Sequence, residues 1–335
     1  MDLQGEAMSI PSTLSHLTFV LALCLGSPAC AEDVSAYPTK PVRVIVPVGA
    51  GAGIDTAARV TAEAVEKHLG QRIIIENKPG AGLRIGTTQV AKSPPDGYTL
   101  LFTSPSPIAV VEHFSQNLDY VPARDFRPVA IGVYQPVLFI VRPSLGVKSI
   151  AEFVAYAKSN PGKISFGIQG LGGEMHLMVE VFKKSAGVNL TLVPYNAAAQ
   201  AIVDLLGDRL DAMQLVIPPI KGHVDAGRLR ALATLNAKRV PQFPDVPTMS
   251  EVGMPEMTNA IWFGYLAPAK TPQAVIDKLA RAFGQLQSDS ALAMRIAEMG
   301  AVLSIVGPVE FARIIDDDRR RYGRIVAESN LDKLN

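Results

Sequence analysis

The chain of 335 residues alternates between short apolar runs and longer stretches in which apolar residues recur at helical spacing. Residues 42–48 form a β-branched run that enters a glycine-rich turn, and residues 57–70 place Val60, Ala64 and His68 on one helical face. The same pattern predicts further strands at residues 72–77 and 98–104 and a helix that opens from the glycine turn within residues 79–93. Nearly continuous apolar strands separated by helices indicate a parallel sheet covered on both faces.

The alternation starts again after an apolar run at residues 136–143. Ser149 and Glu152 have the spacing of a capping box at the start of a helix, which Pro161 and Gly162 end. Further strands are predicted at residues 163–168, 189–195, 211–217, 229–235 and 261–269, and further helices at residues 175–187, at residues 198–207, around His223 and in the tail beyond Thr271.

These two series of elements predict an α/β protein with two domains and two crossovers, near residues 132–142 and 250–262. We expect a discontinuous domain 1, residues 32–135 and 258–335, and a domain 2 that spans residues 136–257. Two crossings provide a natural hinge with a ligand cleft between the lobes.

The N-terminal part of the sequence has the layout of a secretory signal peptide. An apolar core at residues 17–25 is followed by the small residues Ala29 and Ala31 of an A-x-A cleavage site, and the core is too short for a permanent membrane span. No Lys or Arg precedes the core, although Met8 is an alternative start. We therefore expect residues 1–31 to be removed and the protein to be exported to the periplasm.

Cysteine content and charge exclude several function classes. Both cysteines, Cys24 and Cys30, lie inside the predicted signal peptide, so the mature chain has no disulfide, thiol chemistry or cysteine–zinc site. The formal net charge of +1 gives no indication of a nucleic-acid partner or an anionic membrane surface.

Three glycine-rich turns are the candidate binding elements: GAGAG at residues 49–53, PGAGLRIG and QGLGGE. The first turn fails the dinucleotide pattern G-x-G-x-x-G, because Ile54 and Thr56 occupy the final position in its two possible registers. No Gly-Lys-Ser/Thr follows any turn, which excludes a P-loop. We expect no cofactor, and a strand–turn–helix of this kind suits a small carboxylate as well as a phosphate.

A series of motifs resembles, in order, the Bug/TctC family of periplasmic solute-binding receptors of tripartite tricarboxylate transporters. The motifs are YPTKPVRVIVPVGAGAGID, IIIENKPGAGLRIG, PPDGYTLLF, DFRPVA, PGKISFG, VPYN, DLLGDRLD, LRALA, FPDVPT and WFGYLAPAKTP. The resemblance implies a type II periplasmic-binding-protein fold, a cleft that closes on a carboxylate, and delivery to an inner-membrane transporter. We expect a monomeric receptor and not an enzyme; the main rival is an extracytoplasmic hydrolase of esters or amides.

By the same resemblance, two loops of the first lobe hold a ligand carboxylate through main-chain N–H groups, and the second lobe closes over it. The candidate ligand-binding residues are Val48, Gly49, Ala50, Gly51, Ala52, Gly53 and Asp55 in the first loop, Gly82, Leu83 and Arg84 in the second loop, Ser104 and Ser106 after the third strand, and Gln169, Gly170, Gly172, Met175, His176, Asn196, Ala197, Asp204 and Gln214 in the second lobe.

The chain departs from the family pattern in both loops. Ala52 and Ile54 replace small or hydroxyl residues in the first loop, and Leu83 and Arg84 replace Gly and Asn in the second. Added apolar bulk and a cation suggest a ligand with an apolar body and carboxylate ends, such as the aromatic dicarboxylate terephthalate. Citrate-like and aliphatic dicarboxylates remain alternatives.

Several candidate residues have a simpler structural interpretation. Asp55 either caps the first helix or orders waters around a ligand, and Arg84 either pairs with a carboxylate or is solvated. Asp204 either faces the cleft or lies on a solvated helix face. His176 and Glu180 are four residues apart, but no third metal ligand is near them in sequence, and we expect no metal.

Two further features also have structural interpretations. Ser104 and Ser106 have no nucleophile-elbow motif, so we expect them to form hydrogen bonds only. The DDDRRR run at residues 316–321 is predicted to be a solvated helix face.

Overall fold

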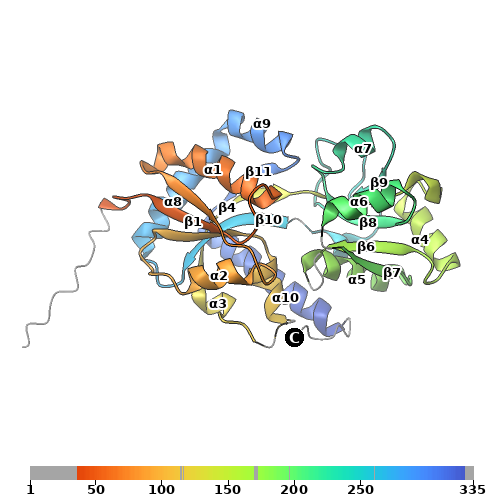
Figure 1. Cartoon of the computed structure of the whole chain (residues 1–335), viewed down its shortest axis with the longest axis horizontal. Helices are drawn as coiled ribbons and strands as arrows, with labels where there is room; N and C mark the ends of the chain where they lie inside the picture. Colours follow the sequence, from red (N-terminus) through yellow and green to blue (C-terminus); the bar gives the residue numbers. More distant parts are fainter. Residues whose placement is uncertain are drawn as a thin grey trace, which may run out of the picture. The chain divides into compact units, whose positions relative to one another are not determined.

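The computed structural model describes residues 36–328 apart from residues 114, 116, 170–172, 196 and 260. The predicted signal peptide, residues 1–31, lies outside the described residues. The described chain contains two β-sheets, of six and five strands, and helices pack beside both of them (Figure 1).

The six-stranded sheet has the strand order β11-β4-β10-β3-β1-β2. Its strands are β1 (Val42–Val46), β2 (Ile73–Asn77), β3 (Thr99–Thr103), β4 (Phe126–Gln135), β10 (Ile261–Pro268) and β11 (Val302–Val306). β1 pairs in parallel with β2 and β3. β10 is antiparallel to both β3 and β4, and β11 is antiparallel to β4, so the sheet is mixed.

The five-stranded sheet has the strand order β7-β6-β8-β5-β9. Its strands are β5 (Val137–Val141), β6 (Ser165–Gln169), β7 (Thr191–Tyr195), β8 (Ala212–Val216) and β9 (Arg230–Thr234). β6 is parallel to β7 and β8, whereas β5 is antiparallel to β8 and β9.

The prediction of parallel sheets is correct for β1–β3 and for β6–β8, and it is wrong for β5 and β10. A parallel neighbour needs a crossover connection, usually a helix. β5 follows β4 after the single residue Pro136 and enters the other sheet without such a helix. A strand that carries the chain directly from one sheet to the other has no such helical crossover, so it is not required to run parallel to its neighbours.

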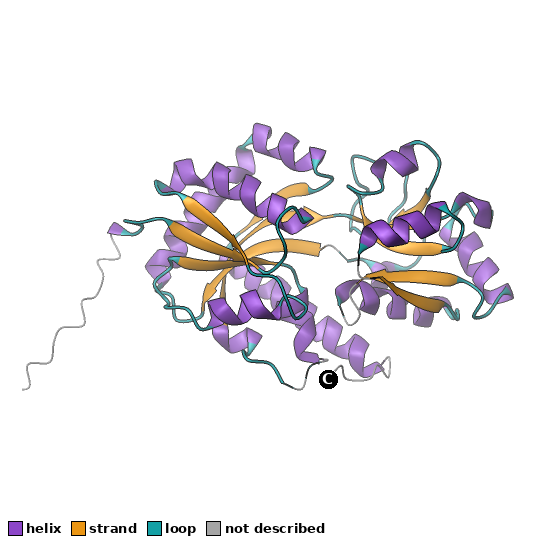
Figure 2. Cartoon of the chain, in the orientation of Figure 1, coloured by secondary structure: helices purple, strands orange, loops and turns teal. Residues whose placement is uncertain are grey.

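Helices cover both faces of the six-stranded sheet, as the colouring by secondary structure shows (Figure 2). The α-helices are α1 (Gly53–Leu69), α2 (Arg84–Ala91), α3 (Pro122–Asp125), α4 (Ile150–Ser159), α5 (Glu174–Ala186), α6 (Ala198–Leu206), α7 (Lys221–Asp225), α8 (Gln273–Gly284), α9 (Ser290–Glu298) and α10 (Pro308–Glu328). Across residues 36–328, leaving aside the undescribed positions, no helix combines the length and apolar character needed to span a membrane.

Two predicted helix signals are confirmed. Gly70 has the left-handed φ of 76° and its N–H donates to the carbonyl of Glu66 at 2.9 Å, which ends α1. The Ser149 hydroxyl accepts the N–H of Glu152 at 3.2 Å at the start of α4, and the Glu152 carboxylate accepts the N–H of Lys148 at 2.8 Å. In the ideal capping box Glu152 would accept the N–H of the N-cap residue, Ser149, whereas here it accepts the N–H of the residue before it.

The sequence pattern misses two strands, β4 and β11. Pro128 lies inside β4, and a proline within an apolar run argues against a central strand. The structure accommodates it because β11 pairs with β4 only from Ile131 to Tyr134, so at Pro128 the partner is Leu266 of β10 alone. The pairing of β4 with β11 therefore needs no N–H from Pro128.

The DDDRRR run of α10 is only partly the solvated face that was predicted. Asp317 pairs with Arg313 and Arg320 on the exposed side. Asp318, by contrast, is half-buried and accepts a hydrogen bond from the indole N–H of Trp262 at 2.8 Å. α10 is thereby anchored to β10, the strand that returns to the six-stranded sheet.

β10 and α10 approach each other closely at Gly264. A Cβ at this position would lie 2.6 Å from the Phe311 ring and 3.2 Å from the carbonyl oxygen of Ala130. Phe311 is fully buried and packs edge-on against Trp262 with 4.9 Å between ring centroids. We therefore expect Gly264→Ala to lower the free energy of unfolding by about 1–3 kcal/mol, because the packed core must shift to admit the methyl group.

Urea denaturation measures this change, with Gly284→Ala as the matched control. A Cβ at Gly284 meets no atom within 4 Å and its φ is −55°, so the control is expected to be neutral or slightly stabilising. Equal stability of the two variants would contradict the close approach of β10 and α10.

Candidate functional site

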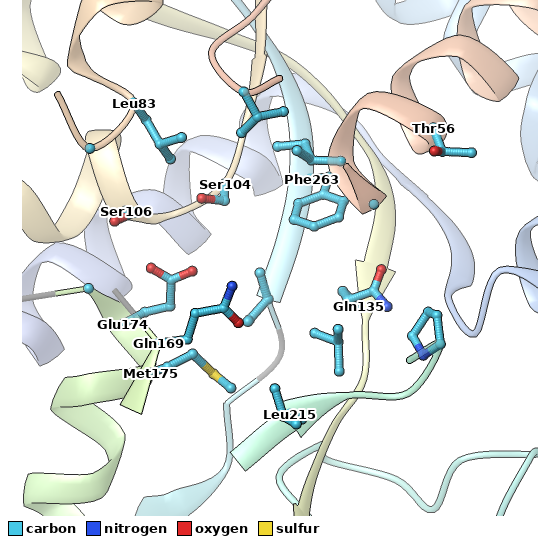
Figure 3. Close-up of a pocket in the computed structure, with 18 of the residues that line it drawn as sticks. Thr56, Leu83, Ser104, Ser106, Gln135, Gln169, Glu174, Met175, Leu215 and Phe263 are labelled. Carbon is cyan, nitrogen blue, oxygen red and sulfur yellow. The ribbon is translucent and has the colours of Figure 1, made fainter. Parts of the chain in front are cut away.

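A cavity of about 1020 Å³ lies between loops and strand ends that belong to both sheets (Figure 3). This volume is at the upper end of the range of small-molecule sites. Residues from the side of the six-stranded sheet are Val48, Gly51, Gly53, Ile54, Thr56, Ala81, Gly82, Leu83, Arg84, Ser104, Ser106, Val111, Ser115, Gln135, Ile261, Phe263 and Met299. Residues from the other side are Gln169, Gly173, Glu174, Met175, Leu215, Val216, Pro218 and Pro219.

The structure brings about half of the predicted site residues to this cavity. Those that line it are Val48, Gly51, Gly53, Gly82, Leu83, Arg84, Ser104, Ser106, Gln169 and Met175. Those that do not line it are Gly49, Ala50, Ala52, Asp55, His176, Ala197, Asp204 and Gln214. Gly170, Gly172 and Asn196 lie outside the described residues.

The first glycine turn presents the start of α1 to the cavity. Ala52 is the N-cap residue of α1 and provides no side-chain hydrogen bond to the helix. The backbone N–H groups of the first helical turn have no partner within the helix and carry its positive end. Because Gly51, Gly53 and Ile54 line the cavity, this turn places the positive end of α1 at the cavity wall.

Asp55 supports this turn from beneath and is only 1% exposed. Its carboxylate accepts the N–H of Gly51 and the side-chain amide of Asn77, both at 2.8 Å, and pairs with Arg59. Asn77 also donates to the carbonyl of Val48 at 3.1 Å. Asp55 therefore fixes the turn that precedes α1, and it does not cap the helix N–H groups, the first of its two predicted roles.

The electrostatics of Asp55 agree with this role. Burial acts to raise the pKa of its carboxyl, but hydrogen bonds from Arg59, Gly51 and Asn77 outweigh burial and lower the pKa below its ordinary value of 3.8. The group is therefore ionised at neutral pH and fixes the turn through charge-assisted hydrogen bonds.

The second loop has a strained backbone where it meets the cavity. Ala81 and Leu83 have φ values of 48° and 74°, and Gly82 between them has a φ of 62°. A left-handed conformation costs roughly 1–2 kcal/mol for a residue with a side chain, and such strain is concentrated at functional sites. Leu83 is the N-cap residue of α2, so the strain directs the start of a second helix toward the cavity.

Polar side chains extend this wall. The Arg84 guanidinium donates to the hydroxyl of Ser115 at 3.0 Å, is half-buried and lines the cavity. Ser104 and Ser106 follow β3 and also line the cavity. The wall therefore combines main-chain N–H groups, hydroxyl groups and one guanidinium.

On the other side, Gln169 ends β6, and Glu174 and Met175 begin α5. His176 lies behind them, 7% exposed, and burial lowers its pKa. His176 and Glu180 are 4.0 Å apart, but no group of three metal-ligating side chains occurs among the residues that the structure describes.

Two predicted second-lobe residues do not line the cavity. Asp204 accepts hydrogen bonds from the Tyr195 hydroxyl and from Arg209, each at 2.8 Å, and these contacts lower its pKa. Gln214 is 2% exposed in the middle of β8, and its side-chain amide has no hydrogen-bond partner among the described residues.

Sequence reasoning missed the part of the cavity built by the connecting strands. Gln135 ends β4, and Ile261 and Phe263 begin β10. All three line the cavity where the chain passes between the sheets. The predicted crossovers could have located these residues, because a segment that joins two lobes lies at the base of the cleft between them.

Comparisons with known proteins agree with this architecture. The family model described as "Tripartite tricarboxylate transporter family receptor" matches residues 57–331. Protein BugT of Bordetella pertussis is 34% identical over 319 residues, which are 94% of this chain and 98% of BugT. The chain has the two-domain type II periplasmic-binding-protein fold, and it belongs to the tripartite tricarboxylate transporter receptor family.

Two solved structures from Rhodopseudomonas palustris are also similar. One, solved with adipate, has 31% sequence identity and a TM-score of 0.78 over 89% of this chain and 100% of the other. The second, MatC with bound malate, has 29% identity and a TM-score of 0.73 over 87% of this chain and 100% of the other. Members of this family are periplasmic solute-binding receptors rather than enzymes.

The Asp55 contacts generate a stability prediction. Asp55→Asn removes the charge that three donors share, and we expect the free energy of unfolding to fall by about 1–3 kcal/mol at neutral pH. Because the folded-state pKa is lowered, the stabilisation is complete above the unfolded-state pKa and is lost as pH falls through the folded-state pKa. The difference between variant and wild type is therefore expected to shrink in acid.

Urea denaturation near pH 7 and near pH 3 measures both effects. The control is Asp225→Asn, which removes an exposed ion pair with Lys221 on α7 and is expected to cost at most about 0.5 kcal/mol. A difference between Asp55→Asn and wild type that stays constant with pH would show that the carboxylate does not carry the effect.

Proposed function

We propose that the protein is an extracytoplasmic receptor that captures a carboxylate between two lobes and delivers it to an inner-membrane tripartite tricarboxylate transporter. The lobes comprise residues 32–135 with 258–335, and residues 136–257; residues 1–31 are a cleaved signal peptide, and the mature receptor is a monomer in the periplasm. Family membership supports this function, as do the adipate and malate bound to two similar proteins.

The observation that carries the proposal is the uncapped start of α1 at the cavity wall, braced by Asp55. One ligand carboxylate accepts hydrogen bonds from first-turn N–H groups there, assisted by the second loop. Contacts from the second lobe are added on closure. They are essential, because a ligand held equally well by the open form does not shift the equilibrium.

The cavity lining supports a ligand with an apolar body. Ile54, Leu83, Val111, Phe263 and Met299 contribute hydrophobic side chains between the polar groups. An aromatic dicarboxylate such as terephthalate satisfies both features, with an apolar ring between two carboxylates. Aliphatic dicarboxylates and citrate are the alternatives within the same class.

A thermal-shift screen of the protein lacking residues 1–31 tests the function. Benzoate, terephthalate, adipate, malate and citrate are compared, and at a hundredfold excess over its dissociation constant a bound ligand is expected to add about 2.7 kcal/mol of stability. We expect terephthalate to give a larger shift than citrate. No stabilisation by any of these carboxylates would refute the proposed function.

Arg84→Ala tests whether the guanidinium contacts the ligand. Loss of a charge-assisted hydrogen bond is worth about 1.5–3 kcal/mol, so we expect dicarboxylate binding to weaken by tenfold or more. Arg228→Ala, at an exposed position outside the cavity, is the matched control and is expected to bind as wild type does. Isothermal titration calorimetry measures both, and equal affinity of the two variants would remove Arg84 from the site.

A further inference from the structure

Glu174 is an acidic side chain in a cavity that we assign to a carboxylate. It is the first residue of α5, and the preceding N-cap residue, Gly173, offers no side-chain cap. Figure 3 shows its carboxyl group directed toward the side of the cavity that carries Ser104 and Ser106. The second lobe thus has a helix N-terminus at the cavity, but a carboxylate of the protein already lies there.

The charged groups around Glu174 do not neutralise it. Among the described lining residues only Arg84 and Glu174 are ionisable, and no ion pair joins Glu174 to a cation in the part of the chain that the structure describes. The Ser106 hydroxyl and the backbone N–H of Glu174 itself donate hydrogen bonds to its carboxylate. Two neutral donors stabilise a buried charge less than a cationic partner does.

Helix α10 contributes a further negative charge near Glu174, that of Asp318. Asp318 acts on Glu174 as a like charge, and the Tyr322 hydroxyl donates to Asn259 at 3.0 Å rather than to Glu174. Arg321 donates to the carbonyl of Glu256 at 2.9 Å. On α5 itself, the nearest titratable group is His176, which burial holds in its neutral form.

Burial, and then the charge of Asp318, raise the pKa of Glu174, although the Ser106 and backbone hydrogen bonds oppose this. The pKa of Asp318 is itself raised to about 6, chiefly by burial. A ligand carboxylate that arrives beside Glu174, which is half-buried at the cavity wall, adds a second like charge there. Two carboxylates in such a site do not both stay ionised, and a proton shared between them is the usual resolution.

We propose that Glu174 couples ligand capture to proton uptake, so that a dicarboxylate binds together with one proton, shared between its far carboxylate and the carboxyl of Glu174. This inference rests on the proposed function. The near carboxylate is held at the α1 turn, and the far one reaches the start of α5. The proton comes from solvent, and no other bond forms or breaks.

The coupling gives Glu174 a role in specificity. At the far end of the cavity it accepts a hydrogen bond, so it favours a ligand end that carries a proton and disfavours a fully ionised one. A monocarboxylate such as benzoate has no group at that end and binds without taking up a proton. Terephthalate and benzoate share one ring and one carboxylate, which isolates the contribution of the second carboxylate.

Isothermal titration calorimetry of the protein lacking residues 1–31 tests the proposal. Terephthalate and adipate are titrated at pH 6, 7 and 8, where their carboxyls are ionised, in two buffers of different ionisation enthalpy at each pH. We expect uptake of up to one proton per dicarboxylate bound and a dissociation constant that rises by up to about tenfold per pH unit. Benzoate is expected to show neither effect.

Glu174→Gln keeps the size of the side chain and removes the titrating group. We expect this variant to bind both dicarboxylates with no proton uptake, with a dissociation constant independent of pH, and more tightly than wild type at pH 8. Asp225→Asn changes the net charge equally at an exposed site and is expected to retain the wild-type pH dependence.

The outcomes separate this proposal from the function on which it rests. Dicarboxylate binding to wild type without proton uptake, or a pH dependence that Glu174→Gln retains, would overturn the role of Glu174 and leave the receptor function intact. Failure of every carboxylate to bind wild type at each pH would overturn both.

Discussion

A single buried carboxylate, that of Asp55, organises the wall of the cavity. It connects the turn at Gly51 to Asn77 at the end of β2, and Asn77 in turn holds the carbonyl of Val48 after β1. The strand exit, the glycine turn and the first turn of α1 are therefore fixed by one network. Because Asp55 occupies the N–H of Gly51, the donors left for a ligand are those of the helix start. An anion site that is already formed loses less conformational entropy when it binds.

The second loop is fixed against the first by close packing rather than by charge. A Cβ at Gly86 of α2 would lie 2.9 Å from the carbonyl oxygen of Lys78 and 3.0 Å from the Cβ of Pro47. The two loops interlock at this glycine, so the left-handed backbone of residues 81–83 has a rigid base. Pro47 therefore packs against the helix that follows the strained residues.

The sequence predicted those parts of the protein whose signals are local. Strand, glycine turn and helix follow one another along the chain, so the first two loops and the start of α5 could be located without a structure. Gln135 and Phe263 could not, since they reach the cavity only because strands from two sheets meet there. The two alternatives for Asp204 stayed open for a related reason: its partners, Tyr195 and Arg209, lie outside helix α6 and are not given by helical spacing.

The direct passage from β4 to β5 has a mechanical consequence. Only Pro136 separates the two strands, and its ring restricts backbone rotation about φ, so in the lobe closure proposed above this connection would act as a short pivot rather than a flexible tether. Points beside a pivot travel least when one lobe rotates against the other. A ligand contact to Gln135 would therefore be the same in the open and the closed state. Such a contact adds affinity without favouring either state. Contacts that favour the closed state over the open state must therefore form far from Pro136, where the start of α5 faces the glycine loops across the cavity.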